Sequence, residues 1–432
     1  MNWRTEYKAL FWIVVLFTIA FFMPLEKALF RQSIIDALEL TRWYAREHVI
    51  LCLIPAFFIA GSIAVFLSQN AVIKYFGADA PKWLSYSVSS VSGVILAVCS
   101  CTVLPLFSGI HKRGAGLGPA IAFLYSGPAI NILAIILTAR VLGWELGLAR
   151  IIGAVIFAVV IGLIMHYLYR KEEENKAATQ FVPADEDGRP MSQTVLHMAA
   201  LIGILIFATW AEPAQDTGFW ATVFAYKWHL VILFSGLLAY SLVYILNITW
   251  WYVLAAIAAT GVSAYLVPST PMLVFAVGAV SLGVVLSFSE GEPADWMSET
   301  WSFTKQIMPL LGAGVLVAGF LLGMPGSDGG IIPNHWIENI VGGNSLGANF
   351  FASIIGGFMY FATLTEIPIL QGLINSGMGQ GPALALLLSG PAISLPNLLV
   401  IRSVLGTQKT IVFLLLVVVL STVCGLIFGS FF

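Results

Sequence analysis

Residues 98–133 read V-C-S-C-T-V-L-P-L-F-S-G-I-H-K-R-G-A-G-L-G-P-A-I-A-F-L-Y-S-G-P-A-I-N-I-L, and much of this stretch occurs again 263 positions later. Residues 105–130 align without a gap with residues 368–393, P-I-L-Q-G-L-I-N-S-G-M-G-Q-G-P-A-L-A-L-L-L-S-G-P-A-I, and 14 of the 26 positions are identical. The identities include prolines, glycines and a Ser-Gly-Pro triplet, which chance similarity between apolar helices does not align. The sequence therefore contains an internal duplication.

The composition indicates an all-α polytopic membrane protein. Of the 432 residues, 59% are hydrophobic and only 10% are charged, and the mean hydropathy is +0.93. An ordinary soluble domain carries about 25% charged residues, and a soluble protein of this composition would expose large apolar patches. The net charge of −2 comes without a basic stripe, which argues against a nucleic-acid partner, and the four cysteines lie in apolar segments rather than in a disulfide framework.

The apolar segments divide the chain into two homologous units. A span needs about 20 apolar residues, and roughly thirteen segments qualify: 9–26, 48–68, 88–110, 115–139, 146–168, 195–212, 226–246, 248–267, 270–289, 304–323, 348–374, 381–404 and 410–431. The predicted parts are a retained first span and an amphipathic interfacial helix (1–47), repeat 1 (48–168), a charged linker (169–194), four connecting spans (195–289) and repeat 2 (290–431). Each repeat has about four spans, and either parallel or inverted repeats fit this pattern.

The two Ser-Gly-Pro triplets predict helix breaks near the middle of the membrane. Proline removes a backbone N–H and crowds the preceding turn, and broken helices expose backbone polar groups to a solute. One such motif is more often a kink whose serine bonds to its own helix, but two at matching positions favour discontinuous helices that lie close together and line a central site. The substrate-binding candidates are therefore Ser126, Gly127, Pro128 and Asn131 in repeat 1 and Ser389, Gly390, Pro391, Ser394 and Asn397 in repeat 2.

A second candidate site is the run Cys99, Ser100, Cys101 and Thr102. Thiolates are soft ligands that suit soft metals and, by the same logic, trivalent arsenic. Side chains two apart on a regular helix do not face each other, so Cys99 and Cys101 could share a metal or arsenic atom only on an unwound backbone. The alternative is that both are small residues at a helix contact. Repeat 2 has no cysteine here and ends its matching run in Thr365, a further candidate contact.

Glu366 is the one carboxylate side chain from residue 347 to the C-terminus, and it aligns with Val103 of repeat 1. A charge at the bilayer centre costs about 2.5–3.5 kcal/mol on insertion scales, which makes it a functional candidate. We expect Glu366 to couple transport to protons, or to pair with Arg402; the alternative is a helix end that faces water. Among the basic residues, Arg150 and Arg402 are expected, with His111, Lys112, Arg113 and Arg140, at the membrane interface.

Motifs for nucleotide binding and for common catalytic sites are absent from the sequence. It has no G-x-x-x-x-G-K-[ST] loop, no H-E-x-x-H, no C-x-x-C-H and no G-x-S-x-G. We therefore expect neither an enzyme nor a bound cofactor, and no transport driven by nucleotide on this chain.

The run C-S-C-T-V-L-P-L-F-S-G at 99–109, with F-L-Y-S-G-P at 123–128, resembles the ArsP-type predicted permeases. That family has a C-S-C-x-x-x-P-L-F motif and a later Ser-Pro element, and includes exporters of trivalent organoarsenicals. The resemblance covers both repeats and assigns the family's cysteine pair to Cys99 and Cys101. This sequence departs from the family pattern at residues 97–98, where it has Ala-Val instead of Pro-Phe, and in the second motif, where it has the Ser-Gly-Pro form.

Three functions compete at this point. The first is a secondary-active exporter of a thiophilic solute, an organoarsenical or soft metal, held by Cys99 and Cys101, with arsenic resistance as its role. The second is a permease for a small organic or inorganic anion that meets the positive ends of half-helices. The third, a membrane-embedded enzyme or assembly factor, lacks a catalytic constellation. The resemblance implies a multi-pass protein of the bacterial inner membrane whose partners are lipid, a small solute or ion and, in a homo-oligomer, further copies of itself.

Overall fold

The chain folds into helices, and a computed structural model describes residues 7, 10, 11, 13–15, 17, 18, 21–66, 81–96, 100–112, 114–130, 132–179, 190–210, 218–324, 330, 331, 340–358, 366–375 and 377–432. These ranges contain no strand. The helices are α2 (Ala28–Tyr44), η1 (Ala45–Leu53), α3 (Ile54–Phe66), α5 (Lys82–Leu96), α6 (Ser100–Lys112), α7 (Leu117–Ala129), α8 (Ile132–Val141), α9 (Trp144–Thr179), α10 (Met191–Ala208), α11 (Phe219–Tyr244), α12 (Trp250–Leu266), α13 (Pro271–Ser287), α14 (Glu292–Leu322), α16 (Leu346–Phe358), α17 (Glu366–Asn375), α18 (Gln380–Ile393), α19 (Leu395–Leu405) and α20 (Thr407–Phe428).

The helix boundaries follow the spacing of the sequence duplication. Helices α7, α8 and α9 begin at residues 117, 132 and 144, and α18, α19 and α20 begin 263 positions later, at 380, 395 and 407. The turns match as well: Gly114 and Gly377 have φ of 90° and 105°, and Gly143 and Gly406 have φ of 106° and 85°. Only glycine adopts these left-handed conformations without a steric penalty, so the repeated glycines fix where each helix starts.

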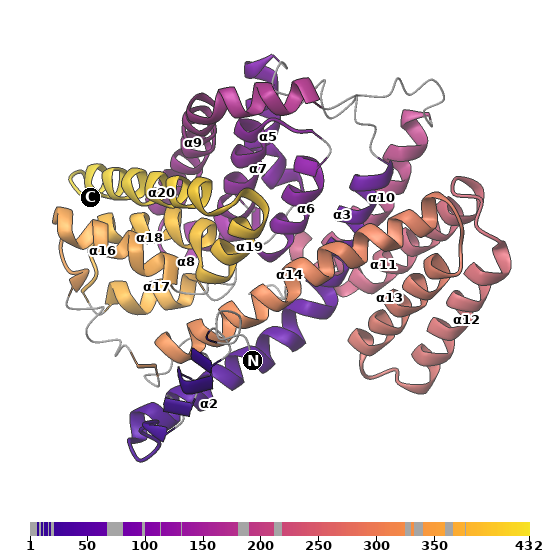
Figure 1. The fold of residues 1–432 in the computed structure, drawn as a ribbon, viewed down its shortest axis with the longest axis horizontal. Coiled ribbons are helices and arrows are strands. Elements are labelled where there is room, and N and C mark those ends of the chain that lie inside the picture. Colours follow the sequence, from indigo (N-terminus) through magenta and orange to yellow (C-terminus); the bar gives the residue numbers. More distant parts are fainter. Residues whose placement is uncertain are drawn as a thin grey trace.

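Two long helical rods cross the molecule side by side. Helices α2, η1 and α3 form one continuous rod, and α14 packs along it (Figure 1). The indole Nε1 of Trp296 donates to the carbonyl of Phe58 at 2.7 Å. The face of α2 that carries Asp36, Ala37 and Leu40 is buried, and Asp36 Oδ2 accepts the backbone N–H of Met324. The predicted amphipathic helix therefore continues directly into the next predicted span.

Helices α7 and α18 lie at the centre of the bundle. All 13 residues of α7 and residues 381–393 of α18 are buried. Helices α5 and α9 cover α7, and α16 and α20 cover α18, while α10–α13 form a separate group at one side (Figure 1). A Cβ on Gly118 would lie 2.8 Å from the Gly162 carbonyl, and one on Gly381 would lie 2.5 Å from the Gly425 carbonyl. Small residues thus let α7 and α18 approach their neighbours closely.

The helices support a multi-pass membrane protein but do not test the predicted count of thirteen spans. Within the described ranges, five helices are long and apolar enough to cross a bilayer, namely Val49–Phe66, Trp144–Glu173, Ala221–Tyr244, Glu292–Leu321 and Thr407–Phe428. The pair α18 and α19, bent by 46°, adds a sixth. Two predicted spans, 115–139 and 381–404, are each interrupted at a described non-helical residue, Ile130 and Ser394.

The breaks lie a few residues beyond the Gly-Pro pairs. The prediction put them at Gly127 and Gly390, but α7 continues to Ala129 and α18 to Ile393. Proline clashes with the Cβ of the residue before it, and glycine has none, so a Gly-Pro pair can lie inside a helix. In the second half, the break is at Ser394, whose ψ of 147° is extended, and Pro396 follows in the first turn of α19.

Helix α9 extends to Thr179, well into the predicted charged linker. Glu173 Oε2 accepts the backbone N–H of Leu117, the first residue of α7, at 2.6 Å. Glu172 Oε1 accepts from Lys409 Nζ at 2.7 Å. The first residues of the predicted linker therefore contact both repeats.

We expect Glu173→Ala to lower stability by about 1 kcal/mol, because it removes a carboxylate that accepts an orphan N–H at a helix N-terminus. Glu299→Ala is the matched control, since the ion pair of Glu299 with Lys112 has side chains that are 38% and 42% exposed, and such an exposed pair contributes about 0–1 kcal/mol. Thermal unfolding of the purified protein in detergent measures both variants. An equal or smaller shift for Glu173→Ala would contradict a capping role.

Candidate functional site

The two repeats touch at equivalent positions of their central helices. The hydroxyl of Tyr125 in α7 donates to the carbonyl of Leu388 in α18 at 2.8 Å. Leu388 is the residue that aligns with Tyr125 in the duplication, and each immediately precedes a Ser-Gly-Pro triplet. The triplets therefore lie close to each other in the buried centre.

The serines of the two triplets have different partners. Ser126 Oγ donates to the carbonyl of Ser89 in α5 at 2.8 Å, with Phe123 of its own helix at 3.3 Å as a second acceptor. Ser389 Oγ donates to Leu386 of its own helix at 3.3 Å. The alternative of a serine bonded back to its own helix thus holds for Ser389, whereas Ser126 joins α7 to α5.

Each helix break leaves carbonyl groups without helical partners, and a side chain from beyond the break donates to one of them. In the first half, Arg150 Nε of α9 donates to the carbonyl of Ala129 at 3.1 Å. In the second half, Asn397 Nδ2 of α19 donates to the carbonyl of Pro391 at 3.1 Å. Because an unsatisfied buried carbonyl costs about 1–3 kcal/mol, these two side chains stabilise the broken helices.

Arg150 and Glu366 form an ion pair between the repeats. Arg150 Nη1 lies 2.6 Å from Glu366 Oε1 in α17, and the two side chains are 0% and 2% exposed. Arg150 Nη1 also donates to Thr138 Oγ1 of α8 at 3.0 Å. Removing one partner of a buried pair typically costs about 3–5 kcal/mol, because the other charge is left uncompensated.

The predictions for the arginines were wrong in two respects. Arg150 is buried rather than interfacial, and it is the partner of Glu366. Arg402, the predicted partner, is exposed and its Nε donates to Thr407 Oγ1 at 3.0 Å. The signal for Arg150 was present in the sequence, since it lies in an apolar segment where an ionisable residue is a functional candidate by default.

Several buried polar atoms near the breaks have no partner among the described residues. They are Arg150 Nη2, Ser394 Oγ and Asn397 Oδ1. Buried polar groups are normally hydrogen-bonded, so three such atoms on residues at two helix breaks mark a place where a polar solute can bind.

Part of the predicted site lies outside the described residues. Cys99, Asn131 and Thr365 fall there entirely, and so do the side chains of Ser100, Cys101 and Thr102. Ser100, Cys101 and Thr102 have helical backbone, in the first turn of α6, so the predicted unwinding does not include Cys101. Among the described residues, no group of three or more His, Cys, Asp and Glu side chains could hold a metal ion.

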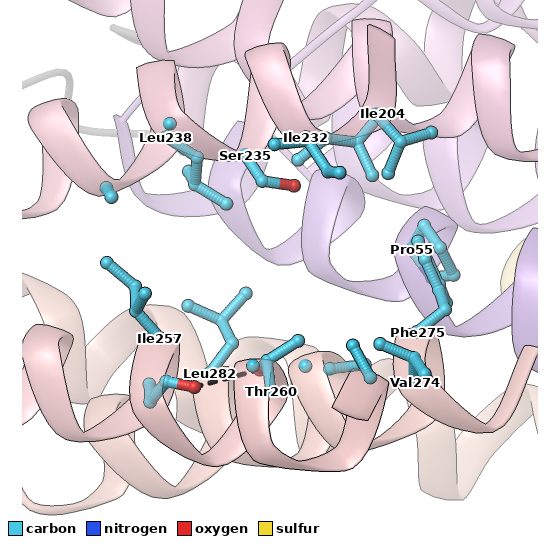
Figure 2. A pocket seen from close by; sticks show the side chains of 18 of the residues that line it. Pro55, Ile204, Ile232, Ser235, Leu238, Ile257, Thr260, Val274, Phe275 and Leu282 are labelled. Atoms are coloured by element: carbon cyan, nitrogen blue, oxygen red, sulfur yellow. Dashed lines mark hydrogen bonds between the residues drawn. The ribbon is translucent and has the colours of Figure 1, made fainter. Parts of the chain in front are cut away.

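A cavity of about 690 Å³ lies elsewhere, between α11 on one side and α12 and α13 on the other (Figure 2). Its lining has no charged residue; of the hydroxyls, Thr260 Oγ1 donates to the carbonyl of Ala256 at 2.8 Å. A polar group without a hydrogen-bond partner is costly in such an apolar environment. This cavity therefore suits apolar chains and not a polar solute.

Comparison with known proteins gives a family and several relatives. A family model described as a predicted permease, ArsP_1, matches residues 34–430. UPF0718 protein MJ0584 of Methanocaldococcus jannaschii is 40% identical over 405 residues, which cover 92% of this chain and 94% of that protein. UPF0718 protein YraQ of Escherichia coli is 21% identical over 306 residues, 71% of this chain and 56% of that protein. No solved structure matches the chain.

We expect Tyr125→Phe to destabilise the protein by about 1 kcal/mol, the usual contribution of one buried hydrogen bond. Tyr86→Phe is the matched control, because the Tyr86 ring is buried but its hydroxyl has no partner among the described residues. Thermal unfolding in detergent compares them. Equal shifts for the two variants would mean that the Tyr125 hydroxyl does not hold the repeats together.

Proposed function

Since this chain belongs to the ArsP_1 family of predicted permeases, we propose that it is a secondary-active transporter that moves a small solute through a mid-membrane site between its two repeats. The observation that carries this proposal is the cross-repeat contact at Tyr125 and Leu388, with the Arg150–Glu366 pair beside the breaks. Broken helices that meet at the centre of a duplicated bundle are the usual architecture of a transporter site.

The first solute class is thiophilic: a trivalent organoarsenical or a soft metal species exported by way of Cys99 and Cys101. The support is the C-S-C run at the start of α6, the softness of thiolates and the family. Under this proposal the protein acts in the cell membrane, the inner membrane of a bacterium, as an efflux protein that confers resistance to arsenicals.

Efflux of trivalent methylarsenite from proteoliposomes tests this class. We expect Cys99→Ala/Cys101→Ala to lose at least about tenfold in rate, because even the loss of an outer-shell partner of a metal ligand typically costs about 10–100-fold. Cys52→Ala is the matched control, because Cys52 lies in η1, outside the run at 99–102, and it should transport as the parent does. Normal efflux in the first variant would remove the cysteines from the mechanism.

The second solute class is a small organic or inorganic anion, and the specific observation in its favour is Arg150. A fully buried guanidinium next to a helix break supplies positive charge where a transporter site is expected. Under this class the cysteines are incidental.

Under either class, we propose that Glu366 carries the coupling proton. Its support is the burial of the carboxylate and its ion pair with Arg150, whose Nε donates to the carbonyl at the end of α7. The aligned Val103 cannot titrate, so only one half of the site exchanges protons.

A pH gradient of one unit stores about 1.4 kcal/mol per proton, enough for about tenfold accumulation of a solute coupled to one proton. We expect Glu366→Gln to keep solute exchange between the two sides of proteoliposomes and to lose this accumulation. A Gln variant that responds to the gradient as the parent does would exclude Glu366 as the coupling site.

A further inference from the structure

We infer that Arg150 binds the negative charge of the transported solute, and that Glu366 occupies the guanidinium only while the site is empty. The inference rests on the proposed permease function and takes up its anionic solute class. Glu366 therefore competes with the solute for Arg150, and protonation of Glu366 ends this competition.

The hydrogen bonds of Arg150 leave room for such a ligand. A guanidinium has five N–H donors, and the described partners accept three hydrogen bonds: Nε donates to Ala129, and Nη1 donates to Thr138 and Glu366. Nη2 has no partner among the described residues, although the side chain is fully buried. A carboxylate usually takes both arms of a guanidinium. Here Glu366 takes one, so an oxyanion with two oxygens can bind where Glu366 now binds with one.

The duplication shows that packing does not require the charges. The positions that align with Arg150 and Glu366 are Phe413 and Val103, and both are buried. The same helix positions are therefore filled by apolar side chains in the other half. Buried ion pairs rarely stabilise a protein more than apolar residues of similar volume do, so the charged pair is better explained by binding than by folding.

No third charge balances this pair among the described residues. Helices α17 and α18 carry no other titratable residue, and Tyr125 on α7 donates its hydroxyl to Leu388. On α9, Glu172 is 22 residues from Arg150, about 33 Å along a helix, and it accepts from Lys409 of α20. The remaining titratable residues of the helices around the pair are Lys82 and Tyr86 on α5, Arg140 on α8, Glu145, His166, Tyr167, Tyr169, Arg170, Lys171, Glu173, Glu174 and Lys176 on α9, and Cys424 on α20.

The charges then balance in two states only. In the empty state, the carboxylate of Glu366 neutralises Arg150. In the loaded state, a proton from water forms an O–H bond on Glu366, and the anion neutralises Arg150 through Nη1 and Nη2. A state with the proton alone or the anion alone leaves a bare charge in the apolar interior, which is costly. One proton and one negative charge therefore cross together, and the proton returns to water on the other side.

Anion binding to the purified full-length protein tests this scheme by calorimetry at several pH values, with formate, acetate and nitrate as probes because each carries one negative charge throughout this pH range. In the parent, we expect at least one of these anions to bind, and to bind more tightly as the pH falls, because protonation removes the competitor. In Glu366→Gln, the affinity should rise about tenfold at neutral pH and lose its dependence on pH. In Arg150→Gln, binding should be lost.

Two further variants keep the test decisive. Arg402→Gln is the matched control, since Arg402 is an exposed arginine bonded to Thr407, and it should bind as the parent does. If Arg150→Gln fails to fold, Arg150→Phe/Glu366→Val replaces it, because it copies the residues of the other half. We expect that double variant to fold and to bind no anion.

The inference is overturned if none of the anions binds, if removing Arg150 leaves binding intact, or if Glu366→Gln binds no more tightly than the parent. A purely structural ion pair would lower the thermal stability of both single variants and raise no affinity. The permease proposal fails separately: anion binding that follows these expectations, without flux in proteoliposomes, would keep the Arg150 site and reject transport. Flux of methylarsenite with no anion binding would keep the transport proposal and reject the Arg150 site.

Discussion

The ion pair between Arg150 and Glu366 constrains the centre of the structure because neither charge can reach water. In this structure each charge compensates the other, which holds α9 of repeat 1 and α17 of repeat 2 in contact. Arg150 also donates to Ala129, at the end of α7, and to Thr138 in α8. One side chain therefore connects four helices, including both sides of a helix break. Burying such a pair is favourable only when its remaining donors are satisfied. Arg150 Nη2 has no partner among the described residues, so the pair has an unsatisfied donor.

A duplicated scaffold with an asymmetric site explains the rest of the arrangement. Paired left-handed glycines and equal helix starts give both halves the same local geometry. The side chains at the centre differ: Arg150 aligns with Phe413, and Glu366 aligns with Val103. The shared backbone positions two helix breaks close together, and the unequal side chains give only one half the ability to hold charge.

The sequence predicted local features well and long-range ones poorly. Glycine and proline act on their own backbone, so the duplication and most helical segments could be read directly from their spacing. The exact breaks could not, because Gly127 removes the Cβ that would have clashed with Pro128 and the helix continues to Ala129. The partner of Glu366 lies 216 positions away, and Arg150 and the exposed Arg402 both lie in apolar segments, so the sequence marks both as candidates without showing which one pairs with Glu366. The contacts of Glu173 with α7 were missed for the same reason, since composition alone assigned it to a linker.

The central claim is that solute binds between the repeats, beside the ion pair, and not in the apolar cavity of the connecting helices. A structure determined in lipid nanodiscs with methylarsenite or acetate present tests it most directly. We expect density for the solute at the breaks of α7 and α18, within hydrogen-bond distance of Arg150 or in contact with Cys99 and Cys101. Solute density between α11 and α13, with the Arg150–Glu366 pair intact and the central breaks empty, would contradict it.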